Sequence, residues 1–267
     1  MSDLSNRLDN CVISILGAGQ LGSSLLEGLL HSGIDPHRIY VSTRREEGAR
    51  RLAQIHSVNA ASASQAARHA DLIVIATRPT QVENLLADIA QDISPSTPVV
   101  SLAAKVTLAQ MRSYLPTQPL ARLMPNPPLA VASSAMAWSD LGDHEIYPFL
   151  RTFFSRLGTI VTVEEDLIDI CGALTGHGQA VIYAATEAIA TWGAMQGLSH
   201  DDSLRLAKAC VQGAADAMSS SDQPIDSWTK RTCTPGGSTV RTVAALEAHG
   251  FKGRIISSLD GDQFRNR

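Results

Sequence analysis

The chain has 267 residues and 44% hydrophobic content, which is enough to bury a large core and predicts two domains. Its formal net charge is -4 at pH 7, and lysine and arginine are scattered along the sequence. These properties argue against nucleic acid or an anionic membrane as a partner.

The cysteines and the N-terminal segment bear on the compartment of the protein. The four cysteines lie far apart without a CxxC pair, which indicates reduced thiols and predicts no metal site. The first residues are polar and carry acidic side chains, unlike a signal or transit peptide. No apolar stretch reaches the roughly 18 residues that a membrane helix requires. We therefore expect a soluble, cytoplasmic protein.

The first part of the chain alternates strand-like and helical segments. Its apolar strand-like runs are residues 11–16, 38–42, 71–76, 99–103 and 120–124. Helical spacing follows the first run at Leu21, Leu25 and Leu29 and recurs in residues 81–90. Apolar strands alternating with helices predict an α/β fold whose mostly parallel sheet is covered on both faces. We assign residues 1–163 to a doubly wound Rossmann domain.

Residues 164–267 show no strand pattern and are predicted to form an all-helical domain. Ser199 and Asp202 resemble a capping pair at the start of one helix. Residues 180–195 are apolar nearly all round, as in a helix that is buried on every side. A helical domain of roughly 100 residues can hardly bury such a helix alone. This pattern predicts an interface, most simply that of a homodimer.

The stretch Leu-Thr-Gly-His-Gly-Gln-Ala at residues 174–180 leads into this apolar run. We interpret it as the opening of the helix, where Gly176 and Gly178 leave backbone donors free. Histidine can exchange a proton near neutral pH, so His177 is a candidate proton donor. The alternative is that His177 caps the helix or only fills space.

A glycine-rich hexapeptide, Gly-Ala-Gly-Gln-Leu-Gly, follows the first strand and matches the motif GxGxxG. Gly17 allows a tight turn, Gly19 lets a pyrophosphate approach the backbone, and Gly22 lets the helix pack on the strand. The helix N-terminus at Gln20 and Leu21 then faces the phosphate charge. The spacing alone is a weak signal, but its position predicts a dinucleotide site. The alternative is a structural glycine turn.

The end of the second strand indicates which nicotinamide cofactor binds. An acidic residue there would hydrogen-bond the adenine ribose of NAD, but this chain has Ser42, Arg44 and Arg45. Two guanidinium groups suit the 2′-phosphate of NADPH, which arginine binds bidentately. NADPH is therefore the expected cofactor, and NADH is the alternative. Arg44 and Arg45 would otherwise be ordinary solvated charges at the start of a helix.

Several stretches together resemble pyrroline-5-carboxylate reductases, which use NAD(P)H to reduce a cyclic imine acid to proline. They are GAGQLGSSLLEGL at 17–29, RP at 78–79, VVSLAAKVTL at 99–108, RLMPNPP at 122–128, ALTGHGQA at 173–180 and TPGGSTVRTVAALEAHGF at 234–251. The last three are much more specific than GxGxxG. The resemblance implies a nucleotide domain joined to a helical domain that intertwines with its partner, often in larger assemblies of dimers.

The resemblance also implies which residues bind substrate and cofactor. Backbone amides and hydroxyls of the PGGST loop would receive the substrate carboxylate, although Pro-Gly-Gly is also a plain turn signal. The expected substrate-binding residues are Asn126, Gly178, Gln179, Gly236, Gly237, Ser238 and Thr239. The expected cofactor contacts are Gly17, Gly19, Gln20, Leu21, Gly22, Ser42, Arg44, Arg45, Ala76, Arg78, Pro79, Ala103, Ala104 and Asn126. The candidate catalytic residues are His177 and Thr239.

The chain departs from the family pattern mainly around the expected substrate pocket. His177 and Gln179 stand in place of serine and proline, Lys105 follows Ala104 where the family has glycine, and Pro127 replaces threonine. The nucleotide motif is intact, which suggests an altered substrate more than a decayed enzyme. Lys105 is a candidate contact for an anionic substrate or a cofactor phosphate, although an exposed lysine at a strand end is the commoner case.

These observations lead us to expect an NADPH-dependent reductase of a cyclic imine carboxylate, either pyrroline-5-carboxylate or a related imine of a specialised pathway. Hydride transfer to a protonated C=N bond needs mainly orientation and desolvation, without a metal or a catalytic triad. A β-hydroxyacid dehydrogenase is the second hypothesis, but such enzymes place a lysine where this chain has Val181, Ile182 and Tyr183. A catalytically silent dinucleotide-binding regulator is the third.

Overall fold

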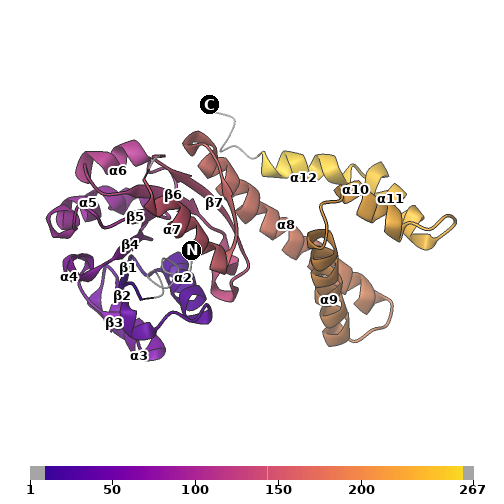
Figure 1. The fold of residues 1–267 in the computed structure, drawn as a ribbon. Helices are drawn as coiled ribbons and strands as arrows, with labels where there is room; N and C mark the ends of the chain where they lie inside the picture. The colour runs from indigo at the N-terminus through magenta and orange to yellow at the C-terminus, as the bar shows by residue number, and fades with distance from the viewer. Residues whose placement is uncertain (1–9, 143, 261–267) are drawn as a thin grey trace. The chain divides into compact units, whose positions relative to one another are not determined.

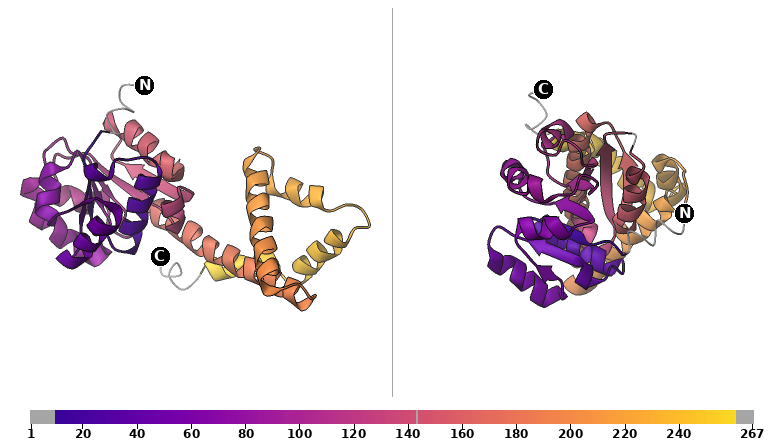
Figure 2. Two further views of the ribbon diagram at one scale, coloured as in Figure 1. Left: turned by 90° about the horizontal axis from the view of Figure 1, so that it is seen from below. Right: turned by 60° about the vertical axis from the view of Figure 1, so that its left-hand side comes forward.

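The computed structural model describes residues 10–142 and 144–260 and divides the chain into two compact units (Figure 1; Figure 2). The first unit ends at Gly176 and the second begins at His177. The division falls inside one long helix, α8 (Ile168–Met195), which contributes to both units. The domain boundary suggested by the sequence, after Val163, follows the last strand directly and stays a prediction.

Within the described residues, the first unit is built on one eight-stranded sheet with the order β3-β2-β1-β4-β5-β6-β7-β8. The strands are β1 (Ile13–Leu16), β2 (Ile39–Ser42), β3 (Asn59–Ala60), β4 (Leu72–Ile75), β5 (Val99–Ser101), β6 (Leu120–Met124), β7 (Ser134–Asp140) and β8 (Gly158–Thr162). All neighbours are parallel except β6 and β7. The strand order reverses between β1 and β4, which confirms the predicted doubly wound fold.

Helices cover both faces of this sheet. They are α2 (Gln20–His31), α3 (Glu46–His56), α4 (Ala63–His69), α5 (Pro79–Ile89), α6 (Leu108–Tyr114) and α7 (Ile146–Phe154), with short 3-10 turns η1 (Pro36–Arg38), η2 (Ala90–Asp92), η3 (Pro127–Val131), η4 (Ser155–Leu157) and η5 (Glu165–Leu167). Ile13 and Ile15 of β1 pack with residues of α2 and α7, whereas Leu16 packs with residues of α4, α5 and α6. Because side chains alternate along a strand, β1 contributes to both cores.

The described residues of the second unit form helices and the connections between them, without a strand. Besides the end of α8 it contains α9 (His200–Ser219), α10 (Ile225–Thr232), α11 (Ser238–Ala248) and α12 (Phe251–Leu259). The Ser199 hydroxyl caps α9 as predicted, because it accepts a hydrogen bond of 3.1 Å from the Asp202 N–H. No helix in the described part of the chain has both the length and the apolar composition needed to cross a membrane.

The glycine pair at Gly176 and Gly178 lies inside α8, so the expectation that it opens a helix is wrong. Neither glycine has a positive φ, and amides in a helix interior are used by helical hydrogen bonds. The turns of α8 before Gly176 form because Ile168 is fully buried and Gly172 packs on Met124. A Cβ at Gly172 would come within 2.7 Å of Met124 Cγ. Tertiary packing thus overrides the low helix propensity of glycine.

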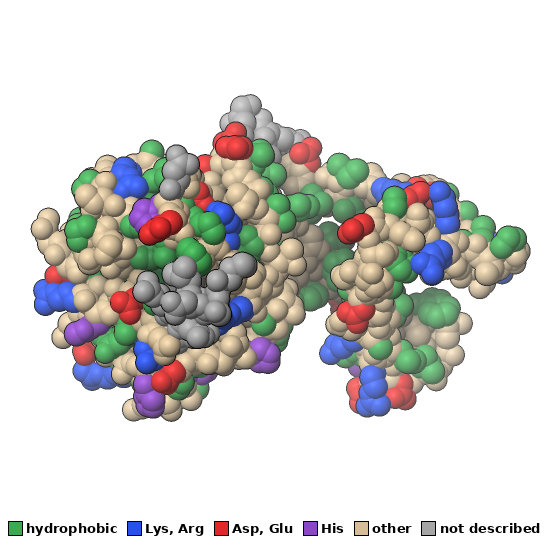
Figure 3. Space-filling model, viewed as in Figure 1, with side chains coloured by type: hydrophobic (Ala, Val, Ile, Leu, Met, Phe, Trp, Pro, Cys, Tyr) green, Lys and Arg blue, Asp and Glu red, His purple; other side chains and the backbone are tan. Residues whose placement is uncertain are grey.

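Several large apolar side chains of α8 are exposed in a single copy of the second unit. Ile182, Tyr183, Ile189, Trp192 and Met195 are all exposed, Met195 by 77%. Apolar side chains are also visible at the surface of this unit in Figure 3. An exposed apolar face of this size agrees with the prediction that α8 takes part in an interface.

Arg122 of β6 forms a buried ion-pair network with the start of α8. Its side chain is 3% exposed, and its Nη2 lies 2.8 Å from Asp169 Oδ1 while its Nη1 lies 3.3 Å from Glu165 Oε1. The same carboxylate oxygens accept hydrogen bonds from the N–H groups of Lys105 (3.2 Å) and Leu108 (2.6 Å). One guanidinium group therefore joins η5, α8 and the β5–α6 connection to the middle of β6.

Replacing Arg122 with methionine should lower the free energy of unfolding by about 3 kcal/mol, because two partly buried carboxylates lose the cation that neutralises them. Urea unfolding followed by circular dichroism measures this change. Adding Glu165→Gln and Asp169→Asn to the same chain should restore most of the loss, since no unpaired charge then remains.

The control for this experiment is Arg50→Met. Arg50 pairs with Glu46 at 2.8 Å, but both side chains are exposed, so its loss should change the free energy by less than about 0.5 kcal/mol. An Arg122→Met variant no less stable than this control would show that the buried network does not hold the fold.

Candidate functional site

The turn between β1 and α2 brings three glycines together at the carboxyl edge of the sheet. Gly17 has a φ of 97°, and a Cβ there would come within 2.4 Å of Thr77 Cγ2. A Cβ at Gly22 would lie 2.8 Å from the Gly17 carbonyl oxygen, so α2 packs directly on the turn. A Cβ at Gly19 would lie 4.0 Å from the Gly17 carbonyl oxygen, an ordinary contact, so the backbone there is open to a ligand. Helix α2 begins there without a side-chain cap or an acidic first turn, an arrangement that favours an anion.

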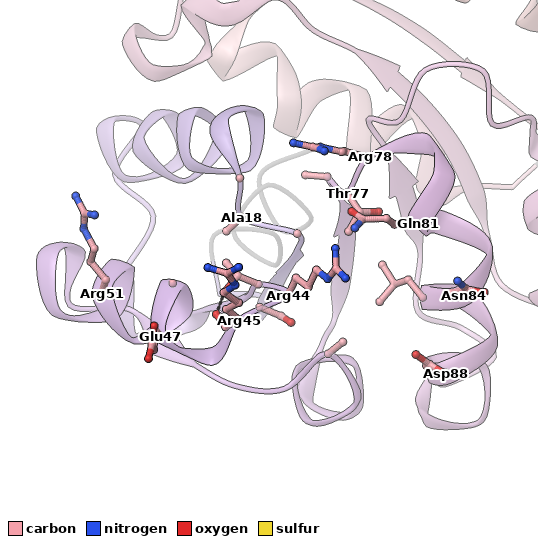
Figure 4. A pocket seen from close by; sticks show the side chains of 18 residues that line it. Ala18, Arg44, Arg45, Glu47, Arg51, Thr77, Arg78, Gln81, Asn84 and Asp88 are labelled. Atoms are coloured by element: carbon pink, nitrogen blue, oxygen red, sulfur yellow. Dashed lines mark hydrogen bonds between the residues drawn. The ribbon is translucent and has the colours of Figure 1, made fainter.

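A cavity of about 1210 Å³ opens at this edge of the sheet (Figure 4). The cavity brings together half of the predicted cofactor contacts, namely Gly17, Gly19, Ser42, Arg44, Arg45, Ala76 and Arg78. The other predicted contacts lie outside its lining, namely Gln20, Leu21, Gly22, Pro79, Ala103, Ala104 and Asn126. The predicted residues that line it come from the β1–α2 turn and from the ends of β2 and β4, as expected for a ligand of an open α/β sheet.

Four arginines give the cavity its charge. They are Arg44, Arg45, Arg51 and Arg78. None of the four forms an ion pair with a described residue, whereas the neighbouring Arg50 pairs with Glu46. Figure 4 shows Arg44 extending from the β2–α3 connection toward α5. Because Glu47 and Asp88 are the acidic residues of the lining, the cavity carries an excess of positive charge and suits phosphate groups.

Helix α5 forms a wall of the cavity that was not predicted. Gln81, Asn84, Leu85 and Asp88 line it from one helical face, and Figure 4 shows the polar ones in a row along the helix. The amides of Gln81 and Asn84 offer both donors and acceptors to a ligand. Their spacing of three and four residues was visible in the sequence, but only the apolar face of this helix had been used.

Further residues of the lining adjoin predicted ones along the chain or were not singled out. They are Ala18, Thr43, Glu47, Gly48, Arg51, Ala63 and Thr77. Thr77 differs from the rest because its Oγ1 is buried and has no hydrogen-bond partner. A buried hydroxyl without a partner is destabilising, so its place in the cavity wall fits a ligand that carries hydrogen-bonding groups.

Asn126 follows β6 at the same edge, and its side chain is held firmly. Its Oδ1 accepts hydrogen bonds from the Ala135 N–H at 2.9 Å and the Ser134 hydroxyl at 3.0 Å. Its Nδ2 donates to the Thr175 carbonyl at 3.3 Å. Since an amide has two N–H groups, one donor of Asn126 stays available to a ligand.

The loop before α11 has the geometry of an anion-binding turn. Gly236 has a φ of 78°, and the Gly237 N–H donates to the Thr234 carbonyl at 2.9 Å. Helix α11 begins after Gly237 without a side-chain cap and without an acidic residue in its first turn. The amides and hydroxyls of Ser238 and Thr239 therefore suit a carboxylate, although the role of this loop stays a prediction.

The predicted residues of α8 lie in the middle of the helix, away from both of its ends. The His177 side chain is exposed, and the Gln179 amide donates to the Tyr183 hydroxyl. The roles expected for His177, Gly178 and Gln179 stay predictions. In the described part of the chain, no three His, Cys, Asp or Glu side chains are grouped so that they could hold a metal ion.

Two family models match the chain. Residues 12–105 match a family described as NADP oxidoreductase coenzyme F420-dependent. Residues 165–265 match a family described as pyrroline-5-carboxylate reductase dimerisation. The first match contains the glycine turn and every residue that lines the cavity, and the second contains almost the whole helical part of the chain.

Curated proteins and solved structures are similar over nearly the whole chain. The pyrroline-5-carboxylate reductase of Corynebacterium melassecola is 30% identical over 248 residues, which cover 90% of this chain and 92% of that protein. Pyrroline-5-carboxylate reductase 2 of Macaca fascicularis is 28% identical over 96% of this chain and 82% of its own.

Two solved structures share the fold. The pyrroline-5-carboxylate reductase of Coxiella burnetii has a TM-score of 0.83 and 26% identity, with 93% of this chain and 94% of that chain covered. The Plasmodium falciparum pyrroline carboxylate reductase, solved with NADP bound, has a TM-score of 0.82 and 23% identity, with coverage of 94% and 95%. Taken with the extent of the Corynebacterium match, these findings show that the chain belongs to the pyrroline-5-carboxylate reductase family.

Proposed function

We propose that this chain uses NADPH to reduce the C=N bond of pyrroline-5-carboxylate, or of a closely related cyclic imine carboxylate, to the cyclic amino acid. The observation that carries the proposal is the cavity at the glycine turn, lined by four arginines without an ion-pair partner among the described residues, in a member of this family. A cavity of this charge at the carboxyl edge of a doubly wound sheet suits a phosphorylated dinucleotide.

The residues of the first unit fit NADPH at each expected group. The open backbone at Gly19 and the first amides of α2 would hold the pyrophosphate. Arg44 and Arg45 would hold the 2′-phosphate, which NADH lacks. The Thr77 hydroxyl would gain the partner that the protein does not supply. NADPH supplies a hydride to the imine carbon when it is bound.

The contribution of the protein to the reaction is mainly orientation and exclusion of water. The amides and hydroxyls of Ser238 and Thr239 would bind the substrate carboxylate at the start of α11. The free N–H of Asn126 would face the part of the carboxyl edge of the sheet that holds the nicotinamide and the substrate. His177 is the candidate donor of the proton that the imine nitrogen requires, and Gln179 is a candidate neighbour of the substrate.

Assembly through the helical part of the chain is part of the same proposal. The exposed apolar side chains of α8 and the match to a dimerisation family support a homodimer or an assembly of dimers. The separated cysteines without a CxxC pair support a cytoplasmic location. A β-hydroxyacid dehydrogenase activity has less support, because α8 contains no lysine.

The purified protein should oxidise NADPH faster than NADH when it is given pyrroline-5-carboxylate or piperideine carboxylate, as followed by nicotinamide absorbance. Arg44→Ala should raise the KM for NADPH by about tenfold, because one charge-assisted contact to the 2′-phosphate is lost. The KM for NADH should not change in this variant.

Arg50→Ala serves as the control, since Arg50 lies on α3, which begins two residues after Arg44, pairs with Glu46 and does not line the cavity. If Arg44→Ala affected NADPH and NADH alike, the assignment of the 2′-phosphate would be wrong. Tight NADPH binding without turnover of any cyclic imine would contradict the enzymatic proposal and favour a silent regulator.

Ser238→Ala should raise the KM for the imine acid by about tenfold and leave the KM for NADPH unchanged, because only a hydrogen bond to the substrate carboxylate is removed. Steady-state kinetics with each substrate varied in turn measure both constants. Thr242→Ala, which removes a hydroxyl bonded to the Ser238 carbonyl at 3.4 Å, is the matched control. If the two variants had equal effects, the substrate carboxylate would not bind at this loop.

His177→Ser should shift the ratio of kcat/KM between pyrroline-5-carboxylate and larger cyclic imines toward pyrroline-5-carboxylate, by at least about tenfold. The reason is that serine is the residue that the family pattern has at this position, whereas histidine is larger and carries a titratable ring. An unchanged substrate profile would assign His177 to a structural role in α8.

A further inference from the structure

The arginine-lined cavity contains an acidic residue on its α5 wall that no described cation neutralises. Asp88 lines the cavity, and its carboxylate forms no ion pair or hydrogen bond with any described residue. Arg44, Arg45, Arg51 and Arg78 line the same cavity and are also without an ion-pair partner among the described residues. A phosphate group would be repelled by an unpaired carboxylate, so the part of the cavity at Asp88 suits a different kind of group.

The position of Asp88 in its helix gives the carboxylate no support. Helix α5 ends at Ile89, and a negative charge in the last turn of a helix is disfavoured by the helix dipole. Glu47, the other acidic residue of the lining, lies in the first turn of α3, where the dipole favours it. Asp92, which follows α5, is neutralised by Arg68 at 2.7 Å. Asp88 alone among these three acids lacks both a cation and a favourable helix end, so its charge is free to meet a ligand.

The lining also contains apolar surface on α5 and at the start of α4. Leu85 and Ala63 line the cavity, are half-buried, and pack against the core between the sheet and helices α4, α5 and α6. Asn84 is next to Leu85 in the chain, is exposed, and has a side-chain amide without a hydrogen-bond partner among the described residues. Apolar side chains combined with a few polar groups are typical of a site for a small organic ring. The α5 wall therefore suits a flat heterocycle better than a phosphate.

The residues of the lining indicate which part of a dinucleotide the cavity would hold. Ala104 and Asn126, expected toward the nicotinamide, do not line it. Arg44 and Arg45, assigned to the 2′-phosphate of the adenine ribose, do line it. The adenine base is attached to that same ribose, and Arg44 extends toward α5 (Figure 4). Adenine is therefore the group of NADPH that the α5 wall would contact.

We propose that the Asp88 carboxylate accepts a hydrogen bond from the exocyclic amino group of adenine while Leu85 packs on the ring. The site would then favour dinucleotides with a 6-amino purine over those with a 6-oxo purine. This inference rests on the proposed use of NADPH and deepens it, because it names the residue that recognises the base. A carboxylate only accepts hydrogen bonds, so it pairs with an amino group, whereas a 6-oxo group would bring two acceptors together.

Binding of two dinucleotides with different purines tests this inference without turnover. NADPH and reduced nicotinamide hypoxanthine dinucleotide phosphate, its 6-oxo analogue, are each titrated against the purified protein, and nicotinamide fluorescence is followed. The unaltered protein should bind NADPH roughly tenfold more tightly, as expected for one hydrogen bond to a charged group. In Asp88→Asn the ratio of the two affinities should fall to about one, because an amide can turn to present either its carbonyl or its amino group. The ratio isolates the base, since both dinucleotides carry the same phosphates.

Two further variants separate recognition of the base from charge and from packing. Glu83→Gln removes an acidic side chain of the same helix that is exposed and does not line the cavity, so the ratio should stay at about ten. Leu85→Ala should weaken the binding of both dinucleotides by a similar factor, roughly fivefold, because apolar contact with the ring is lost. The ratio should not change in this variant.

The inference is overturned if the unaltered protein binds both dinucleotides equally, if Asp88→Asn keeps the preference, or if Glu83→Gln loses it. Unchanged affinities in Leu85→Ala would also overturn it, because the ring would not lie on this wall. Any of these results would leave the use of NADPH intact, whereas failure to bind either dinucleotide would overturn the proposed function as well. An Asp88-dependent preference without reduction of any cyclic imine would contradict the proposed reaction and support the base site.

Discussion

The buried guanidinium group of Arg122 is the contact on which the geometry of the carboxyl edge depends. It neutralises Asp169 and Glu165, and these carboxylates in turn hold the amides of Lys105 and Leu108. A cation buried in β6 can therefore fix three segments that are distant in sequence. The cost of removing such a cation lies mainly in the unpaired carboxylates that it leaves behind.

The packing of α8 against the sheet follows from this anchoring. Because the first turn of α8 is tied to β6, its later turns pass close to Met124, and only a glycine fits at position 172. One turn further on, the Thr175 carbonyl accepts a hydrogen bond from Asn126 and orients its amide. The anchoring thus positions Lys105 and Asn126 at neighbouring strand ends, beyond the arginine-lined cavity.

Much of the fold could be predicted from the sequence, because the buried parallel strands carry long apolar runs. Strands β1, β2, β4, β5 and β6 were predicted, and so was the doubly wound arrangement. Strand β3 has only two residues, β7 consists largely of small residues, and β8 is an edge strand with little burial, so none of them shows a clear pattern. The start of α8 was misplaced because its first turns are stabilised by the packing of Gly172 on Met124, a contact that no local pattern reveals.

In the candidate site, too, the residues specified by local patterns were predicted and those that depend on distant contacts were not. The glycine turn, Arg44, Arg45 and Arg78 were predicted, because local motifs and strand ends specify them. The polar face of α5 was present in the sequence but was overlooked beside its apolar face. The left-handed backbone of Lys105, with a φ of 62°, and the unsatisfied Thr77 hydroxyl could not have been predicted, since both arise from contacts between residues far apart in the chain.

The central claim is that a hydride passes from the nicotinamide to an imine carbon in a site built on this edge. Its most direct measurement uses NADPH deuterated at C4, in each of the two stereochemical forms, with pyrroline-5-carboxylate as substrate and mass spectrometry of the product. The account predicts that one of the two forms yields proline with a single deuterium at C5. Proline without deuterium from both forms would contradict it, and so would the absence of a reduced product from pyrroline-5-carboxylate and from piperideine carboxylate alike.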